Sequence, residues 1–461
     1  MKRSNTLWMA AAAAILCGQA MAAATPEEIK QLGNTITPVG AEKAGNKDGT
    51  IPEWEGGICK PPANYKPHLG MAAGGAPYAD PYAGDKPRLR ITNANLAQHA
   101  DKIDEATREL FKRYPTFAMD IYPTRRSACL PDWVYENTAK RINNAKLEAG
   151  GVGVSGAHAQ IPFPFPKSGY EVMWNGLLRY ELPHSRIVID AGLANSSGVV
   201  TRTSTQVVEN QNLYWDNSIE AVPEGKPYWA LAAKTVYPTS QAGVIQMRHQ
   251  FLRADLKGSQ AWSYIPGQRR VRLAPEFNYD TVATTSGGIL LYDEINGFDG
   301  RMDKFDFKLV GKKEMYIPYN DYKFQNASLE ETMGKNFANP DLLRWELHRV
   351  WVVEATLKSG ERHVQKKKVF YLDEDSWLIS LYYSLDQAGK PYHLMHLASM
   401  QEYEKPAPRG GNYVLYDLNR GIYGNQSKQS GPRSTDTGNS KVTPRAVNFF
   451  TPDSMAGSGI R

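Results

Sequence analysis

The residue types that most often carry out chemistry in enzymes are present in this sequence, but their spacing matches no common catalytic motif. Gly-x-Ser-x-Gly, His-Glu-x-x-His and Cys-x-x-Cys are all absent. His393 and His396 are three residues apart on an expected strand, so they point to opposite faces and make a poor metal-binding pair. We therefore predict no catalytic residues, no metal site and no cofactor. Paired carboxylates for glycoside hydrolysis stay open, because only the fold brings such a pair together.

Two clusters of charge each have a chemical and a structural interpretation. Asp299, Asp303 and Asp306 form an acidic loop, which is more typical of a solvated turn than of a cation site. Lys366, Lys367 and Lys368 form a basic band on an expected strand. Such a band either protects an edge strand from aggregation or binds anionic head groups or an acidic partner.

The beginning of the chain predicts export from the cytoplasm. Lys2 and Arg3 precede a short apolar run at residues 7–16, and Ala20-Met21-Ala22 then offers a small-x-small cleavage site. The run is too short to span a bilayer. We therefore interpret residues 1–24 as a signal peptide that leaves a mature protein in the periplasm, with or without contact to the outer membrane.

The cysteines predict one disulfide in the exported chain. Cys17 lies in the predicted signal peptide, where the bulky Leu16 before it argues against a lipid-anchor site. Cys59 and Cys129 remain in a compartment where disulfides persist. We predict a bridge between Cys59 and Cys129 that ties the N-terminal arm to the segment before an expected helix; two free thiols are the alternative.

The composition is that of a soluble globular protein. The 461 residues are 41% hydrophobic and 22% charged, with a formal net charge of +6. Because this charge is mild and no basic stripe is interleaved with aromatic residues, we expect no nucleic-acid partner. The 25 tyrosines and 10 tryptophans favour sheets and surfaces that hold something partly apolar.

The elements that would position a binding site fall into four segments after the signal peptide. We expect an extended N-terminal arm at 25–90, a helical lid segment at 91–180, a curved antiparallel sheet at 181–423 and a loose C-terminal tail at 424–461. Within the lid segment, helices are predicted at 93–114 and 132–149, and a third begins at a capping box formed by Ser168 and Glu171.

Strand patterns dominate the second half of the chain. The stretch 259–273 (SQAWSYIPGQRRVRL) has the pattern of a hairpin with Pro266-Gly267 at its turn, and we expect the sheet to be organised around it. Further strands are expected at 185–192, 198–210, 228–237, 243–253, 305–317, 345–358, 362–372, 376–385 and 391–403. Many of these strands alternate, so that one face of the sheet meets water and the other meets a core or a cavity.

One resemblance rests on stretches spread along nearly the whole mature chain. They are residues 40–46 (GAEKAGN), 161–164 (IPFP), 261–272 (AWSYIPGQRRVR), 274–275 (AP), 285–288 (TSGG), 308–315 (KLVGKKEM), 349–354 (RVWVVE) and 370–375 (FYLDED). Together they resemble the domain-of-unknown-function family 1329 (DUF1329). That family is similar in its sheet to the LolA/LolB carriers of bacterial lipoproteins, which are incomplete barrels with a helical lid over an oily cavity.

The resemblance implies a protein that faces the periplasm or outer membrane of a Gram-negative bacterium. It also implies association with exporters of the resistance-nodulation-division type and the handling of a hydrophobic cargo. The family has no established catalytic residues, so none are carried over. The long arm and the tail depart from the small LolA carriers and argue against a simple shuttle role.

These observations give one prediction for fold and function. The fold is α+β and mainly β: a large curved antiparallel sheet, an incomplete barrel similar to LolA/LolB, with a helical lid and a long N-terminal arm. The function is that of a non-enzymatic periplasmic carrier or adaptor for a lipid or another hydrophobic small molecule. The predicted cavity-lining residues are Ile245, Met247, Phe251, Trp351, Val353, Ile379 and Leu381. The alternatives are an envelope scaffold without cargo and, less favoured, a hydrolase acting on lipids or glycans.

Overall fold

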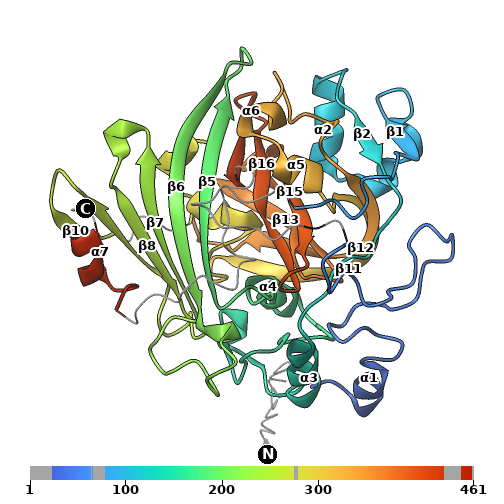
Figure 1. Cartoon of the computed structure of the whole chain (residues 1–461), viewed down its shortest axis with the longest axis horizontal. Coiled ribbons are helices and arrows are strands. Elements are labelled where there is room, and N and C mark those ends of the chain that lie inside the picture. Colours follow the sequence, from blue (N-terminus) through green and yellow to red (C-terminus); the bar gives the residue numbers. More distant parts are fainter. Residues whose placement is uncertain (1–22, 64, 66–77, 275–278, 430–447, 459–461) are drawn as a thin grey trace, which may run out of the picture.

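The computed structural model describes residues 23–63, 65, 78–274, 279–429 and 448–458 (Figure 1). Almost all of the predicted signal peptide and residues 430–447 of the predicted tail lie outside this part. The helices are short: α1 (Pro26–Gln31), α2 (Glu105–Arg113), α3 (Asp132–Lys140), α4 (Gly169–Leu177), α5 (Tyr322–Asn326), α6 (Leu329–Thr332) and α7 (Pro452–Ser458). None of these helices has the length and apolar composition needed to cross a membrane.

Strands make up most of the regular structure. The strands up to residue 273 are β1 (Leu89–Ile91), β2 (Met119–Ile121), β3 (Lys146–Glu148), β4 (Gly153–Ser155), β5 (His184–Ala194), β6 (Val200–Asn212), β7 (Trp229–Tyr237), β8 (Ile245–Gln250), β9 (Gln260–Ile265) and β10 (Arg270–Leu273). Those after it are β11 (Phe305–Pro318), β12 (Trp345–Leu357), β13 (Gln365–Asp373), β14 (Ile379–Asp386), β15 (Pro391–Glu402), β16 (Ala407–Asp417) and β17 (Ile422–Gln429).

One 15-stranded sheet organises the molecule. Its order is β1-β2-β12-β13-β14-β15-β16-β17-β5-β6-β7-β8-β9-β10, with β11 also paired to β12. In Figure 1 the sheet curves strongly, and β5–β10 form one wall while β11–β16 form the other. The end strands of the path, β1 and β10, do not pair with each other among the described residues. The prediction of a mainly β protein built on one large open sheet is therefore confirmed.

The sheet is mixed rather than purely antiparallel. β2 pairs in parallel with β12 through Ile121 and Trp345, whereas the other pairings of the sheet are antiparallel. β2 comes from the segment predicted as a helical lid, so part of that segment extends the sheet. The predicted helix 132–149 is shorter for a similar reason, because Leu147 belongs to β3, which pairs with β4.

The hairpin 259–273 was predicted to be the part around which the sheet is organised, and this prediction was wrong. It forms β9 and β10 as expected, but they lie at one end of the sheet (Figure 1). The turn at 266–269 has four residues, and Leu273 is 58% exposed. Alternation predicts a strand well, but it does not say whether the strand has a neighbour on each side.

The tail predicted to begin at residue 424 starts instead with the second half of β17. β17 pairs with β16 on one side and with β5 on the other, and thus joins the two walls. Asn425, Gln426, Ser427 and Lys428 make this strand polar, which is why its composition resembled a loop. Further along, α7 packs on the outer face of β9 and β10.

Helices cover opposite faces of the β11–β16 wall. Leu110 and Phe111 of α2 pack in one core cluster with Ile317 and Leu394. Val172, Met173 and Trp174 of α4 pack in another cluster with Phe370, Trp377 and Tyr382. Segment 91–180 is therefore not a single lid, because the sheet separates α2 from α3 and α4.

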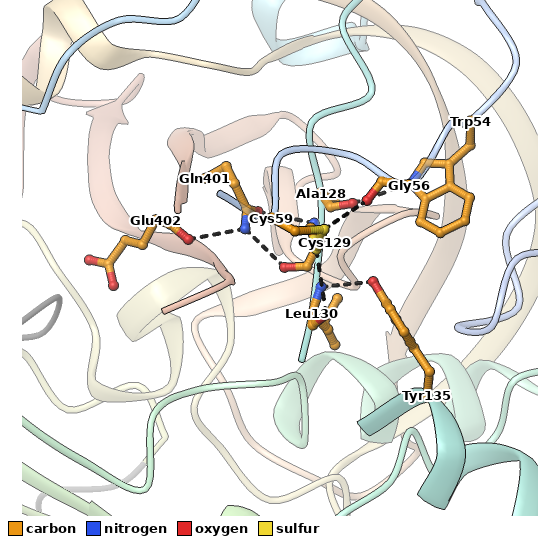
Figure 2. Close-up of a disulfide and its surroundings, with 9 residues drawn as sticks. All are labelled: Trp54, Gly56, Cys59, Ala128, Cys129, Leu130, Tyr135, Gln401 and Glu402. Carbon is orange, nitrogen blue, oxygen red and sulfur yellow. Dashed lines mark hydrogen bonds between the residues drawn. A yellow bond between two sulfur atoms is a disulfide. The ribbon is translucent and has the colours of Figure 1, made fainter. Parts of the chain in front are cut away.

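The N-terminal arm is fastened by the predicted disulfide, which is present in the structure. The Cα atoms of Cys59 and Cys129 are 5.5 Å apart. Figure 2 shows Gln401 of β15 beside the bridge. The side-chain oxygen of Gln401 accepts from the backbone N–H of Cys129 at 3.2 Å, and its side-chain nitrogen donates to the backbone carbonyl of Cys129 at 2.9 Å. The Trp54 indole N–H donates to the Ala128 carbonyl at 3.2 Å. These contacts attach the arm to both the following segment and the sheet.

Candidate functional site

A cavity of about 220 Å³ lies on the inner face of β5–β8. It is bounded across from these strands by the roof segment, which we define as residues 283–299, and by residues of β16 and β17. On the β11–β16 wall, α4 and the roof fill this same face with a packed core. The cavity therefore begins where that core ends.

Strand alternation places a regular set of side chains on the cavity wall. Cross-strand pairing aligns them in rows, one of Ile187, Val208, Ala233 and Gln246 and one of Ser185, Asn210, Leu231 and Arg248. Successive residues of a strand point to opposite faces. Even-numbered residues of β6 and β8 therefore line the cavity together with odd-numbered residues of β5 and β7. The wall is thus a mixture of aliphatic and neutral polar groups.

Charged side chains also line the cavity, and each has an opposite charge beside it. Arg248 Nη1 donates to Asp299 Oδ2 at 2.5 Å, and these side chains are 7% and 12% exposed. Gln250 also donates to Asp299. Burial raises the pKa of Asp299 above its usual value, although Arg248 opposes this. Arg409 pairs with Glu402 in the same way.

Two buried acids hold the roof on the sheet. Asp293 accepts from Lys368 of β13 and lies 3.0 Å from His363 Nε2. Burial alone would raise the pKa of Asp293, but Lys368 and His363 outweigh it and hold that pKa well below its usual range. Glu294 contacts His393 of β15 and accepts from the hydroxyl of Tyr382. These contacts fix the part of the roof that faces the cavity.

The seven residues predicted to line a cavity are not brought together, and none of them lines this one. Ile245 and Met247 lie on the outer face of β8, where they pack with Phe450 and Met455 of the C-terminal segment. Gln246 and Arg248, which alternate with them on β8, face the cavity instead. The alternation of β8 was predicted correctly, but the pattern could not say which face is inside.

The other predicted lining residues belong to packed cores. Trp351 and Val353 pack in the cluster of α4, and the Trp351 ring stacks on Trp377 at 6.1 Å. Ile379 joins that cluster, whereas Leu381 joins the cluster of α2. A bulge separates them, because consecutive β13 residues pair with residues 379 and 381 of β14. Phe251, just past β8, is buried under Lys257.

Sequence reasoning missed the residues that do line the cavity. The residues of β6 that line the cavity are Ser204, Gln206, Val208 and Asn210. Three of these four are polar, so the sequence pattern did not predict an apolar face for this strand. The available signal was a run of neutral polar residues on a central strand, which is unusual for a solid core.

A second cavity, of about 270 Å³, is larger but less informative. Its lining includes Ala23, Ala24, Phe163 and Phe165. It borders the end of the predicted signal peptide, most of which lies outside the described residues. We therefore take the cavity on β5–β8 as the candidate site.

Among the described residues, one cluster has a composition that suits a metal ion. Ligand atoms of His348, Asp373 and Asp375 lie within 4.8 Å of one another, and all three side chains are buried. However, Arg126 donates to both oxygens of Asp375, at 2.8 and 2.6 Å, and His348 Nε2 lies 3.1 Å from Glu346. Arg126 also donates to the carbonyl of Glu42, so the cluster anchors the arm through ion pairs.

The two charged clusters singled out in the sequence are dispersed. Asp299 faces the cavity, Asp303 accepts from the Tyr279 hydroxyl, and Asp306 lies 3.9 Å from Lys358. The basic band is not one continuous patch, because Lys366 is exposed whereas Lys368 is fully buried against Asp293. Neither cluster forms a site of its own.

Comparison with known proteins identifies relatives along most of the chain. The family described as "Protein of unknown function (DUF1329)" matches residues 90–456. The "Uncharacterized protein PA3922" of Pseudomonas aeruginosa is 36% identical over 448 residues, which cover 95% of this chain and 96% of that protein.

Solved structures are more distant. A DUF1329 family protein from Desulfovibrio piger is 12% identical with a TM-score of 0.42, over 62% of this chain and 97% of that one. A LolA superfamily protein from Nitrosomonas europaea, NE2245, is 9% identical with a TM-score of 0.36, over 63% of this chain and 100% of that one.

Proposed function

The chain belongs to the DUF1329 family, and from this premise we propose that it is an exported binding or carrier protein for an apolar molecule. The molecule occupies the cavity on the inner face of β5–β8. The observation that carries the proposal is that aliphatic side chains on central strands, among them Ile187, Val208 and Leu231, face a cavity instead of a packed core. Protein interiors normally close such space, so a cavity of this size supports a binding site here.

The size of the cavity limits what it holds. An apolar cavity of roughly 150 Å³ already binds benzene, and this one has about 220 Å³. It therefore accepts a ring system or a segment of an acyl chain, with the rest of a larger molecule outside. Each buried methylene contributes about 0.8 kcal/mol, which is about fourfold in affinity.

The protein acts in the periplasm in this proposal. The predicted signal peptide supports export, and the Cys59–Cys129 disulfide suits an oxidising compartment. A resistance-nodulation-division exporter or an outer-membrane component is the proposed partner, and this part rests on the family resemblance alone. Cross-linking in intact cells, followed by identification of the cross-linked protein, tests it.

The test of the binding function is displacement of a fluorescent apolar probe by n-alkanols of increasing chain length. We expect affinity to rise about fourfold per methylene and then level off when the cavity is full. Native mass spectrometry of protein purified gently from the periplasm identifies a resident molecule directly. A protein that binds no probe, alkanol or envelope lipid is a scaffold and not a carrier.

Variants separate the cavity from other apolar surfaces. Ala233→Phe fills the cavity and is expected to abolish alkanol binding, whereas Val236→Phe, on the same strand with a 46% exposed side chain, is not. Trp351→Asp tests the face that the sequence pattern favoured. Loss of binding in the Trp351 variant together with normal binding in the Ala233 variant would move the site to that face.

The hydrolase alternative has its own measurement. Turnover of esterase or glycosidase substrates that is lost on changing a single acidic residue would favour an enzyme. Asp299 is the acid to change first, because it faces the cavity and burial raises its pKa.

A further inference from the structure

We propose that the ligand of the β5–β8 cavity is an electrically neutral molecule that carries a hydrogen-bond donor, such as a long-chain alcohol or primary amide. This inference rests on the proposed binding function and names the class of ligand. It is carried by the charges on the cavity wall, which compensate one another within the protein, and by one buried acceptor that has no partner.

The most deeply buried cation on the wall is paired with an acid. Arg248 donates through Nη1 to the Asp299 carboxylate at 2.5 Å and through Nη2 to the Asp299 carbonyl at 3.1 Å. Gln250 donates to the second carboxylate oxygen. An anionic head group would have to compete with Asp299 for the guanidinium, and would leave a buried carboxylate without its cation.

The other arginines of the wall are also paired. Arg409, 11% exposed, donates to Glu402, which is 2% exposed. Arg179 lies 2.5 Å from Glu181 nearer the surface, where these side chains are 17% and 36% exposed. Neither pair leaves a cation that could attract a carboxylate or a phosphate into the cavity.

Asp190 of β5 also borders the cavity, but strand alternation turns its carboxyl group to the opposite face of the sheet, where Lys428 lies beside it. Asp190 of β5 is the cross-strand partner of Lys428 of β17, and accepts from the Thr205 hydroxyl at 2.5 Å. The Lys428 ammonium donates to the carbonyls of Gln325 and Gln429, and is attracted by Asp190. A cationic ligand would thus find each carboxylate of the wall already beside a cation.

Neutral polar groups lie among the aliphatic side chains of the wall. Gln206, Gln246, Gln426 and Ser204 all face the cavity. Asn210 donates through its amide nitrogen to Ser185, but its buried Oδ1 has no hydrogen-bond partner among the described residues. A buried carbonyl oxygen without a donor is unfavourable, so a rotation of the Asn210 side chain toward the cavity would let this oxygen accept from a hydroxyl or amide N–H of the ligand.

The test compares ligands that share one chain and differ only in the head group. Dodecanol, dodecanamide, dodecanoate and dodecyltrimethylammonium are measured by displacement of the same fluorescent probe near neutral pH. We expect both neutral compounds to bind at least about tenfold more tightly than either ion, which is about 1.4 kcal/mol. The affinity of dodecanol should be the same at low and high salt, because no charge is neutralised on binding.

Variants test the role of the ion pair. Asp299→Asn leaves Arg248 without its counter-charge, and we expect it to improve dodecanoate binding about tenfold relative to dodecanol. Glu402→Gln likewise leaves Arg409 without its counter-charge, and it replaces Asp299→Asn in the test if that variant fails to fold. The double variant Arg248→Gln with Asp299→Asn restores neutrality and should restore the preference for dodecanol.

The outcomes separate this inference from the function on which it rests. If dodecanoate or the ammonium compound binds the unaltered protein as tightly as dodecanol, the ligand is not selected for neutrality and the inference is overturned. If none of the four compounds displaces the probe, the binding function itself is overturned. Removal of the Asn210 acceptor by Asn210→Leu should weaken dodecanol more than dodecane, and equal effects would exclude the assigned hydrogen bond.

Discussion

The Nδ1 atom of His393 lies 2.8 Å from both carboxylate oxygens of Glu294, and neither side chain is exposed to solvent. His393 belongs to β15 and Glu294 to the roof, so this contact joins the roof of the cavity to the sheet. Asp417 lies on the other side of the imidazole ring, at 3.9 Å. Burial alone would lower the pKa of His393, but the two carboxylates outweigh it and raise that pKa to about 9.

This pair predicts a specific pH dependence of stability. Between about pH 6.5, where an unfolded histidine loses its proton, and about pH 9, the folded protein alone keeps that proton. The free energy of unfolding contributed by His393 therefore falls as the pH rises, by at most about 1.4 kcal/mol per pH unit. Urea unfolding across this range, compared between the protein and its His393→Gln variant, measures it.

The comparison with the variant is essential because another group acts in the opposite sense. Burial lowers the pKa of Lys428 to about 7, so its contribution to stability increases with pH over the same range. The difference between the two proteins removes this effect. A difference that stays constant from pH 6.5 to 9 would show that His393 is not protonated in the fold.

The disulfide predicts a large loss of stability on its removal. Cys59 and Cys129 are separated by 70 residues, and a loop of that length corresponds to about 4 kcal/mol in the chain-entropy description. The double variant Cys59→Ser with Cys129→Ser should lose a comparable amount in guanidinium unfolding. Addition of a reductant should destabilise the original protein and leave the variant unchanged. An insensitive original protein would mean that the arm is held by its hydrogen bonds alone.

Two arginines with different burial predict very different effects of substitution. Arg126 is 2% exposed in its side chain and bridges Asp375 to the arm, so Arg126→Gln leaves buried carboxylates uncompensated and should cost about 3–5 kcal/mol. Arg90 pairs with Asp120 at 2.8 Å but is 48% exposed, so Arg90→Gln should cost less than about 1 kcal/mol. Equal losses in urea unfolding would contradict the anchoring role of Arg126.

The C-terminal helix protects an apolar patch on the outer face of the sheet. Phe450 and Met455 cover Ile245 and Met247, and Phe450 is 5% exposed. Phe450→Asp should release α7 and expose this patch. The expected result is increased binding of an apolar dye and a greater tendency to aggregate, with little change in cavity binding. Val199→Asp, at a position that is 57% exposed, is the matched control.

The alternation of apolar and polar residues predicted most strands, but it did not predict which elements pack against each strand. Trp351 and Val353 lie on a strand as the pattern indicated, yet both faces of β12 are buried, so alternation did not mark a cavity there. The bulge between Ile379 and Leu381 reverses the faces of β14 without any sign in the sequence. Burial on two faces and insertions in a ladder depend on neighbouring strands that are distant in sequence.

The site itself was harder to predict than the fold. The disulfide followed from a count of cysteines and a compartment, which are properties of the sequence. The cavity depends on where packing stops, and residues such as Gln206 and Asn210 have the same pattern whether they face water or a ligand. Strands with one apolar face were instead predicted to line the cavity, but the protein covers such faces with its own helices, as α7 covers Met247.

The position of β17 sets the order in which the protein can assemble. Its two neighbours are β16, only a few residues before it, and β5, which lies more than two hundred residues earlier in the chain. The two walls are therefore joined last, by a strand that emerges after both of them. In a chain that is threaded across a membrane from its N-terminus, β5 can pair with β6 early, but its other edge stays unpaired until β17 emerges. During this interval the unpaired edge of β5 is the part of the sheet to which a chaperone, a protease or a second nascent chain would bind most readily.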